Sequence, residues 1–175
     1  PKFKSKIINI GTISQKSVSA SKGNGIIAIS NNLAYKNVDF IEKVMGYLSE
    51  TLNEDYPLTL ITDKSIYKKN SKVTYKSSLS SKEVEAELKK HSIYFHASSV
   101  ETLCLPIFEA QENGLIVVAP NLDYALNATH EKKYLYKYKD ANNAIDSINN
   151  AIKDLNGIKA LTANVYCENW KDILK

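Results

Sequence analysis

Two glutamates, Glu101 and Glu109, are separated by seven residues where an apolar run gives way to a helical pattern. The run 93–95 is β-branched and aromatic, which indicates a strand, and Pro106 suits a first helical position because its φ is fixed and it lacks an N–H. Glu101 is therefore expected in a loop and Glu109 in the first turns of a helix. Such a helix points unpaired N–H groups into the crevice where open α/β sheets bind phosphates, so the arrangement suits a nucleotide.

A sheet must hold this loop and helix in place, and the rest of the chain carries signals for one. Short apolar runs predict strands at 7–10, 26–29, 58–61, 73–75 and 115–119. Apolar residues at three- and four-residue spacing predict helices at about 37–53, from Ser81 to about His91, at 144–155 and near Trp170. Because strands and helices alternate, we expect a Rossmann-like α/β domain, a parallel sheet with helices on both faces.

Glycine and proline mark where two of these elements should end. Gly114 is expected to form the C-terminal cap of the helix that carries Glu109. Pro120 is expected to stop the strand 115–119.

Lysines and tyrosines alternate in the segment 132–139, which suits either a nucleic-acid-binding patch or an edge strand. Tyr134, Tyr136 and Tyr138 would share one face of a strand because side chains alternate with a period of two. The net charge of +4 is modest and is typical of a solvated lysine surface. We therefore favour the edge strand and expect no nucleic-acid partner.

Length and composition predict a single domain: 175 residues, of which 43% are hydrophobic and 24% charged. The chain begins at Pro1 and shows neither a secretory leader nor an apolar run long enough to span a bilayer, so a cytoplasmic piece of a larger protein is expected. Its two cysteines, Cys104 and Cys167, lack metal-ligand spacing, which also favours a reducing compartment. All 23 basic residues are lysine, so no guanidinium is available to bind a phosphate.

The stretch 98–110 reads Ser-Ser-Val-Glu-Thr-Leu-Cys-Leu-Pro-Ile-Phe-Glu-Ala, and a glycine and an apolar strand follow at 114–119. This order resembles the Ser-x-x-Glu-x-x-Gly-Leu-Pro-x-x-Glu-Ala signature of the group 1 (family 4) retaining glycosyltransferases. Weaker similarities extend over nearly the whole chain, at 6–11, 25–39, 121–125 and Trp170. The resemblance implies that residues 1–175 form the C-terminal donor-binding domain of a two-domain GT-B enzyme, with the N-terminal acceptor domain absent.

The resemblance also implies roles for individual residues. Glu109 matches the glutamate that binds the ribose diol, and Glu101 matches the glutamate beside the donor sugar, where it orients hydroxyls or stabilises positive charge at the anomeric carbon. Lys36 matches the lysine that binds the phosphates. The backbone N–H groups expected to face the diphosphate or the sugar belong to Thr102, Leu103, Cys104 and Leu105.

Two departures from the family pattern stand out. Asn31 and Asn32 occupy the place of an arginine that usually precedes the phosphate lysine by about five residues, so one charged contact is missing. Cys104 stands where the family has a glycine, and its side chain could crowd the donor or narrow the range of sugars accepted. Either change could impair catalysis.

The implied reaction moves a hexose from a nucleoside-diphosphate sugar, with retention, to a glycan or lipid-linked acceptor, as in surface-polysaccharide synthesis. A helix N-terminus and a lysine can meet the charge of the leaving diphosphate, so neither a metal nor another cofactor is expected. The isolated domain should turn over little or nothing. The missing half would provide any peripheral attachment to the inner face of the membrane.

Other interpretations stay open. Ser98 and Glu101 also fit a capping box, and Glu109 could be ordinary helix surface. Cys104 as a nucleophile has no base beside it in the sequence, and the three histidines, His91, His96 and His130, show no ligand pattern. At the level of the whole chain, a non-catalytic interaction domain and a sugar-nucleotide epimerase of the same fold are the alternatives.

Overall fold

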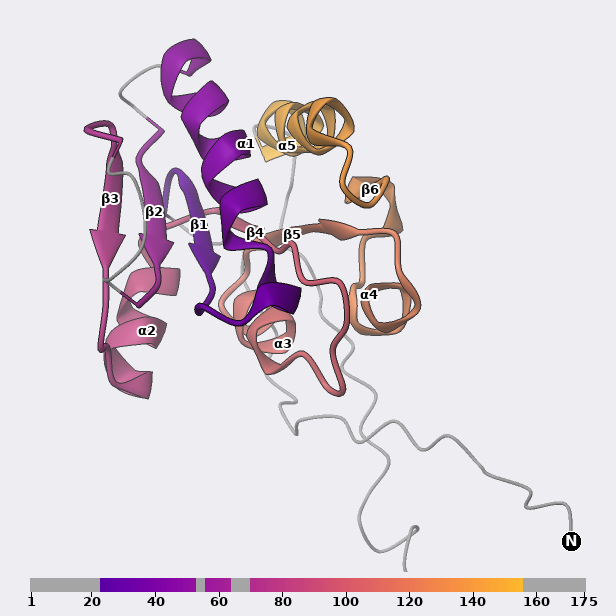
Figure 1. Cartoon of the computed structure of the whole chain (residues 1–175), viewed down its shortest axis with the longest axis horizontal. Coiled ribbons are helices and arrows are strands. Elements are labelled where there is room, and N and C mark those ends of the chain that lie inside the picture. The colour runs from indigo at the N-terminus through magenta and orange to yellow at the C-terminus, as the bar shows by residue number, and fades with distance from the viewer. Residues whose placement is uncertain (1–22, 53–55, 64–69, 156–175) are drawn as a thin grey trace, which may run out of the picture.

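The structure is a computed structural model that describes residues 23–52, 56–63 and 70–155. The described residues form a six-stranded sheet in the order β3-β2-β1-β4-β5-β6, and all five neighbouring pairs are parallel. This confirms the expected Rossmann-like α/β class (Figure 1). The strand predicted at 7–10 and the helix predicted near Trp170 lie outside the described residues.

The strands are short and mostly buried. They are β1 (Ile26–Ile29), β2 (Leu58–Ile61), β3 (Val73–Lys76), β4 (Ile93–Phe95), β5 (Ile116–Pro120) and β6 (Leu135–Tyr136). Central strands of a parallel sheet are covered on both faces, which explains why β1 and β4 read as continuous apolar runs without alternation. The predictions at 26–29, 58–61, 73–75 and 93–95 are confirmed.

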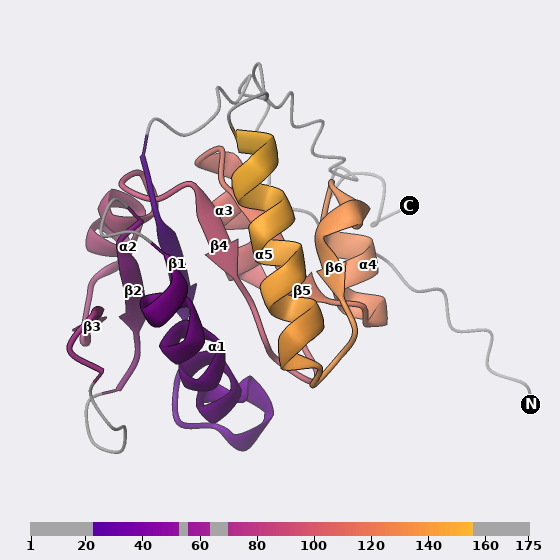
Figure 2. The ribbon, with the colours of Figure 1, turned by 90° about the horizontal axis from the view of Figure 1, so that it is seen from above.

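Helices cover both faces of this sheet. They are α1 (Val38–Thr51), α2 (Ser81–Leu88), α3 (Leu105–Glu112), α4 (Asp123–Ala128) and α5 (Ala141–Leu155), with 3-10 turns η1 (Ala34–Lys36) and η2 (Lys132–Tyr134). The helices α1 and α5 lie on one face, and α2, α3 and α4 on the other (Figures 1 and 2). Accordingly, Ile26 and Ala28 pack in the core shared with α1 and α5, whereas Ile27 packs with α3 and α4.

The ends of α3 differ slightly from the sequence prediction. The helix begins at Leu105, so Pro106 occupies the second helical position, where its missing N–H is equally harmless. Gly114 follows the helix with φ 76°, which confirms the expected glycine cap. Pro120 does not lie beyond β5 but forms its last residue, paired with Tyr136 of β6.

The edge strand predicted at 132–139 is present but much shorter. Only Leu135 and Tyr136 are in strand conformation, and Tyr134 belongs to the preceding 3-10 turn. Tyr134 and Tyr136 are nevertheless both buried in the core under α5, while Tyr138 is only partly covered. The tyrosines thus serve the packing of the sheet edge.

No helix among the described residues is long and apolar enough to cross a membrane.

Candidate functional site

The loops after β1 and β4 meet at the centre of the sheet. From β1 the chain goes to β2 on one side, while β4 pairs with β1 on the other side, so the strand order reverses between these two neighbours. In open α/β sheets, ligands bind at such a reversal, outside the carboxyl ends of the strands. Lys36 follows β1 and Glu101 follows β4, which places both predicted residues at this point.

Lys36 and Glu101 form an ion pair in which Nζ lies 2.6 Å from Oε1. Both side chains are largely buried, with 17% and 10% of their surface exposed. The bond also decides between two interpretations of Glu101, because a carboxylate bound to Lys36 in a loop does not cap a helix. The alternative of a capping box at Ser98 and Glu101 is therefore excluded; among the described residues, a capping box joins Ser80 and Glu83 at the start of α2.

Two hydrogen bonds to backbone carbonyl groups hold the two loops together independently of that ion pair. Ser99 donates its N–H to the carbonyl oxygen of Tyr35 at 2.7 Å. The side-chain amide of Asn37 donates to the carbonyl oxygen of Ala97 at 2.8 Å. Asn37 can do so because it adopts a left-handed conformation, φ 49°, which asparagine tolerates better than most residues. The distance between the two loops is thus set by one main-chain hydrogen bond and by the side chain of Asn37.

His96 and Cys104 lie beneath the ion pair. His96 Nε2 is 3.4 Å from Cys104 Sγ and 3.6 Å from Glu101 Oε1, and its Nδ1 is 3.1 Å from the Tyr94 hydroxyl. Burial lowers the pKa of His96 to about 4, so the ring is neutral near pH 7. Cys104 has no histidine beside it in the sequence. In the structure, however, the loop folds back over the end of β4 and brings Cys104 next to His96.

Cys104 is a buried thiol and not an activated nucleophile. Burial, followed by the charge of Glu101, raises the pKa of Cys104 to about 12, so the thiol keeps its proton at neutral pH. Its backbone is left-handed, with φ 48°, a conformation that glycine adopts without strain. This explains physically why a glycine suits the position. The Cys104 side chain is buried beside His96 and not on the surface of the loop.

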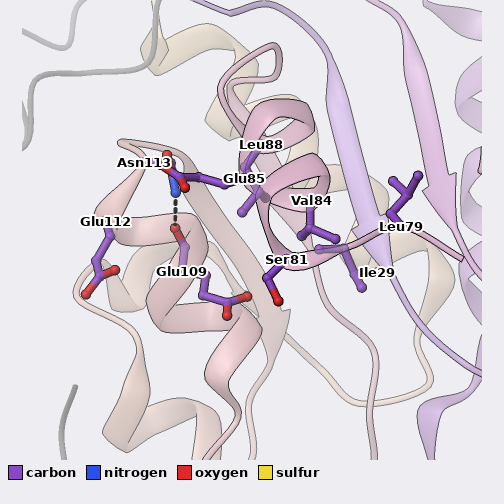
Figure 3. A pocket seen from close by; sticks show the side chains of 9 residues that line it. All are labelled: Ile29, Leu79, Ser81, Val84, Glu85, Leu88, Glu109, Glu112 and Asn113. Carbon is purple, nitrogen blue, oxygen red and sulfur yellow. Dashed lines mark hydrogen bonds between the residues drawn. The ribbon is translucent and has the colours of Figure 1, made fainter.

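A pocket of about 490 Å³ opens between α2 and α3 beside the end of β1 (Figure 3). Its size is within the range of small-molecule sites, roughly 300–1,000 Å³. It is lined by Ile29, Leu79, Ser81, Val84, Glu85, Leu88, Glu109, Glu112 and Asn113. Four of these residues are apolar and three are carboxylates, so the pocket combines apolar side chains with hydrogen-bond acceptors.

Glu109 extends from α3 toward Ser81 at the start of α2 (Figure 3). Its backbone carbonyl accepts a hydrogen bond from the Asn113 amide at 2.8 Å, while its carboxylate faces the pocket. Loss of solvent at the pocket wall and the neighbouring charge of Glu112 raise the pKa of Glu109. Glu109 is thus part of a pocket and not only helix surface.

The remaining predicted residues lie around the same loops. The side chain of Asn31 accepts a hydrogen bond from the N–H of Leu33 at 3.2 Å, so it shapes the loop after β1. Asn32 is exposed in that loop. In the loop before α3, Thr102 and Leu105 are exposed and Leu103 is partly buried.

Sequence reasoning missed the apolar wall of the pocket. Ile29, Leu79 and Val84 come from three separate elements, and no local motif connects them. The topology of the sheet could have pointed to them. Ile29 ends β1, Leu79 follows β3 and Val84 lies on α2, so all three are near the carboxyl edge of the sheet.

The sequence model described as "Glycosyl transferases group 1" matches residues 9–166 of the chain. The chain belongs to this family. This confirms the resemblance that the stretch 98–110 carries. No curated protein sequence matches the chain.

Solved structures of GT-B glycosyltransferases share the fold. TarM is 18% identical with a TM-score of 0.63, over 81% of this chain and 31% of that chain. The C-terminal domain of LpcC, a group 1 family protein from Francisella tularensis, is 16% identical with a TM-score of 0.62, over 75% of this chain and 77% of that chain. The pneumococcal O-GlcNAc transferase GtfA, solved with UDP and GlcNAc, is 15% identical with a TM-score of 0.60, over 88% of this chain and 33% of that chain. The chain thus spans about a third of the length of TarM and GtfA.

Proposed function

We propose that this chain is the donor-binding domain of a retaining glycosyltransferase and binds a nucleoside-diphosphate sugar at the carboxyl edge of its sheet. One observation carries the proposal: the Lys36–Glu101 pair, with Nζ 2.6 Å from Oε1, lies at the reversal of strand order, and the pocket that contains Glu109 opens at the same edge. A cation, a helix N-terminus and a pocket that offers both apolar side chains and carboxylates are three features that suit a nucleoside diphosphate.

The diphosphate would contact Lys36 and the N-terminus of α3. A leaving diphosphate gains negative charge, and preorganised positive charge or N–H groups stabilise it without moving. The start of α3 follows directly after Cys104, and its peptide dipoles favour an anion there. The N–H groups of Thr102, Leu103, Cys104 and Leu105 are in the loop that leads into this helix. Such a site does not need a metal to hold the phosphates.

The nucleoside would occupy the pocket between α2 and α3. Its apolar side chains, such as Leu79 and Val84, suit the face of a base, and the ionised Glu109 carboxylate can accept both hydroxyl groups of a ribose diol. UDP is the first nucleotide to test, because the structures of GtfA and of a TarM mutant from S. aureus contain it.

Glu101 would act on the sugar. As the donor enters, Lys36 can turn from Glu101 to the phosphates and leave the carboxylate beside the anomeric carbon. There it would orient hydroxyl groups or stabilise developing positive charge. The missing arginine at Asn31 and Asn32 removes one charge-assisted contact, of roughly 1.5–3 kcal/mol, from this scheme.

The activity of the whole protein is part of the proposal. We infer transfer of a hexose to a glycan or lipid-linked acceptor held by an N-terminal domain, in surface-polysaccharide synthesis on the cytoplasmic side of the membrane. The fraction of TarM and GtfA that the chain covers supports a partner domain of this kind. The isolated domain would bind donor but transfer little sugar.

Calorimetric titration with UDP, GDP and ADP in the presence of EDTA tests the proposal. We expect one nucleotide to bind in the micromolar-to-millimolar range, without metal. If none binds at millimolar concentration, the domain is better described as a non-catalytic member of the fold. An epimerase of the same fold would bind UDP too, and product analysis with the complete enzyme distinguishes it, because a transferase moves the sugar to a second molecule.

A further inference from the structure

His96, Glu101 and Cys104 offer three different metal-ligand atoms in one cluster. The imidazole nitrogen, a carboxylate oxygen and the thiol sulfur all lie within 4.8 Å of one another. The histidine and the cysteine are buried, with 2% and 4% of their surface exposed, and the glutamate is partly covered. The three residues come from the end of β4 and the loop that follows it, so the main chain fixes their spacing.

Two of the three distances between ligand atoms in this cluster match a tetrahedral zinc ion, and the third, from Cys104 Sγ to the Glu101 carboxylate, is within 4.8 Å. With bonds of about 2.0–2.3 Å, two ligand atoms of a tetrahedral site lie roughly 3.3–3.6 Å apart. His96 Nε2 is 3.4 Å from Cys104 Sγ and 3.6 Å from Glu101 Oε1. An ion could therefore occupy the cluster with only small side-chain movements.

The surroundings also suit such a site. Metal-binding histidines usually engage their second ring nitrogen in a hydrogen bond that orients the ring. Here the buried Tyr94 hydroxyl lies 3.1 Å from Nδ1, which leaves Nε2 directed toward the cluster. A nitrogen, a sulfur and a single carboxylate form a donor set that favours zinc over magnesium or calcium.

We propose that His96, Glu101 and Cys104 form a binding site for a borderline-soft divalent cation, with Zn²⁺ as the representative ion. Binding converts the Cys104 thiol to a thiolate and releases its proton to solvent, while the imidazole binds through Nε2 with its proton on Nδ1. Lys36 gives up or shares the Glu101 carboxylate, and water completes the fourth position. The inference goes beyond the proposed function and does not depend on it, and a bound ion would compete with the donor sugar for the Glu101 carboxylate.

Cobalt substitution in the full chain tests this site, with Cys167→Ser as background so that Cys104 is the only thiol. We expect one Co²⁺ per chain and a near-ultraviolet charge-transfer band, which requires a thiolate ligand. Competition with Zn²⁺ then gives the affinity of each variant. Cys104→Gly should abolish the band without unfolding the domain, because glycine relaxes the left-handed backbone at that position.

Matched variants decide which other residues bind the ion. His96→Gln and Glu101→Gln should each weaken Zn²⁺ binding by roughly tenfold or more. The controls His130→Gln and Glu112→Gln should bind as the background does. The proposal is overturned if no thiolate band appears, if the band survives in Cys104→Gly, or if either ligand variant binds Zn²⁺ as tightly as its control. None of these readouts uses a nucleotide, so failure here leaves the donor-site proposal unaffected.

Discussion

Lys36 Nζ lies 2.6 Å from Glu101 Oε1, although 65 residues separate the two in the sequence. The pair joins the loop after β1 to the loop after β4, so the cation proposed for the diphosphate already has an anionic partner before any ligand arrives. An incoming phosphate must compete with Glu101 for Lys36. This competition gives the two residues opposite expected effects on nucleotide binding.

Replacing Lys36 by methionine should weaken UDP binding by roughly tenfold to a hundredfold, equivalent to about 1.5–3 kcal/mol for one charge-assisted hydrogen bond. Binding of uridine, which has no phosphates, should change little. Calorimetry with both ligands measures the difference. Lys43→Met, at an exposed position of α1, is the matched control. An equal loss for UDP and uridine would show that the substitution disturbs the pocket and not a phosphate contact.

Replacing Glu101 by glutamine should tighten UDP binding, since Lys36 is then free of its carboxylate partner. The gain should be a few-fold, because the freed ammonium also regains water. In the complete enzyme the same substitution should lower kcat strongly, as it removes the carboxylate beside the sugar. Weaker UDP binding by Glu101→Gln, with the fold intact by circular dichroism, would argue against the competition.

Replacing Glu109 by glutamine should weaken nucleotide binding by roughly tenfold, because an amide accepts hydrogen bonds less strongly than a carboxylate. Its pKa is raised above the ordinary value of 4.5, and the carboxylate is the binding form. UDP affinity should therefore fall as the pH decreases through that raised pKa, and the variant should lack this dependence. Glu112→Gln, on the same helix and pocket, provides the comparison. The wild-type protein should bind a 2′-deoxynucleotide more weakly than the corresponding ribonucleotide, whereas Glu109→Gln should bind the two with similar affinity.

Gly25→Ala should destabilise the fold by about 2 kcal/mol or more. Gly25 has φ 102°, and an added Cβ would overlap the carbonyl oxygen and ring of Pro57. Gly46→Ala, in the middle of α1, should instead stabilise by about 0.5–1 kcal/mol, because the nearest atom to its new Cβ is 3.9 Å away and alanine favours a helix. Urea unfolding of both variants measures the contrast. Similar changes in both would contradict the assignment of Gly25 as a required left-handed turn.

Acid should destabilise the domain through His96. Its folded-state pKa of about 4 lies below the ordinary value of 6.5, so the unfolded chain binds the proton more readily. The contribution of His96 to the free energy of unfolding is thus fully present above pH 6.5. It falls by roughly 3 kcal/mol in total as the pH decreases toward 4. Urea midpoints of the wild type and of His96→Gln between pH 7 and 4.5 test this. The variant should show a shallower decline, and His130→Gln should decline nearly as the wild type does.

Local patterns predicted most of the fold. Most of the buried residues of α1, β1, β2 and β4 are apolar, so the stripe of α1 and the runs of the three strands could be recognised in the sequence. The errors concern α4, which was not predicted, the edge strand, of which only Leu135 and Tyr136 are in strand conformation, and the ends of other elements. Thus α3 begins at Leu105, one residue before the proline, and Pro120 stays in β5 because it lies at the end of the strand.

The site was predicted less completely because its contacts join distant residues. Glu101 and Glu109 could be singled out by spacing, and Lys36 by resemblance. The contact of His96 with Cys104 depends on the path of the nine-residue loop between β4 and α3, and the apolar side chains of the pocket depend on three elements meeting at one edge. Neither is a property of a local pattern.

The hydrogen bonds from Ser99 to Tyr35 and from Asn37 to Ala97 have a consequence for how such a domain can diverge. Both bonds end on carbonyl groups, which do not change when side chains are exchanged, and only the second needs a side chain, that of Asn37, as its donor. Positions 36 and 101 can therefore vary in charge and length while the loops keep their spacing. As long as Asn37 is kept, the residues that would contact the donor can change without changing the spacing of the loops, so one fold can come to bind a different donor substrate.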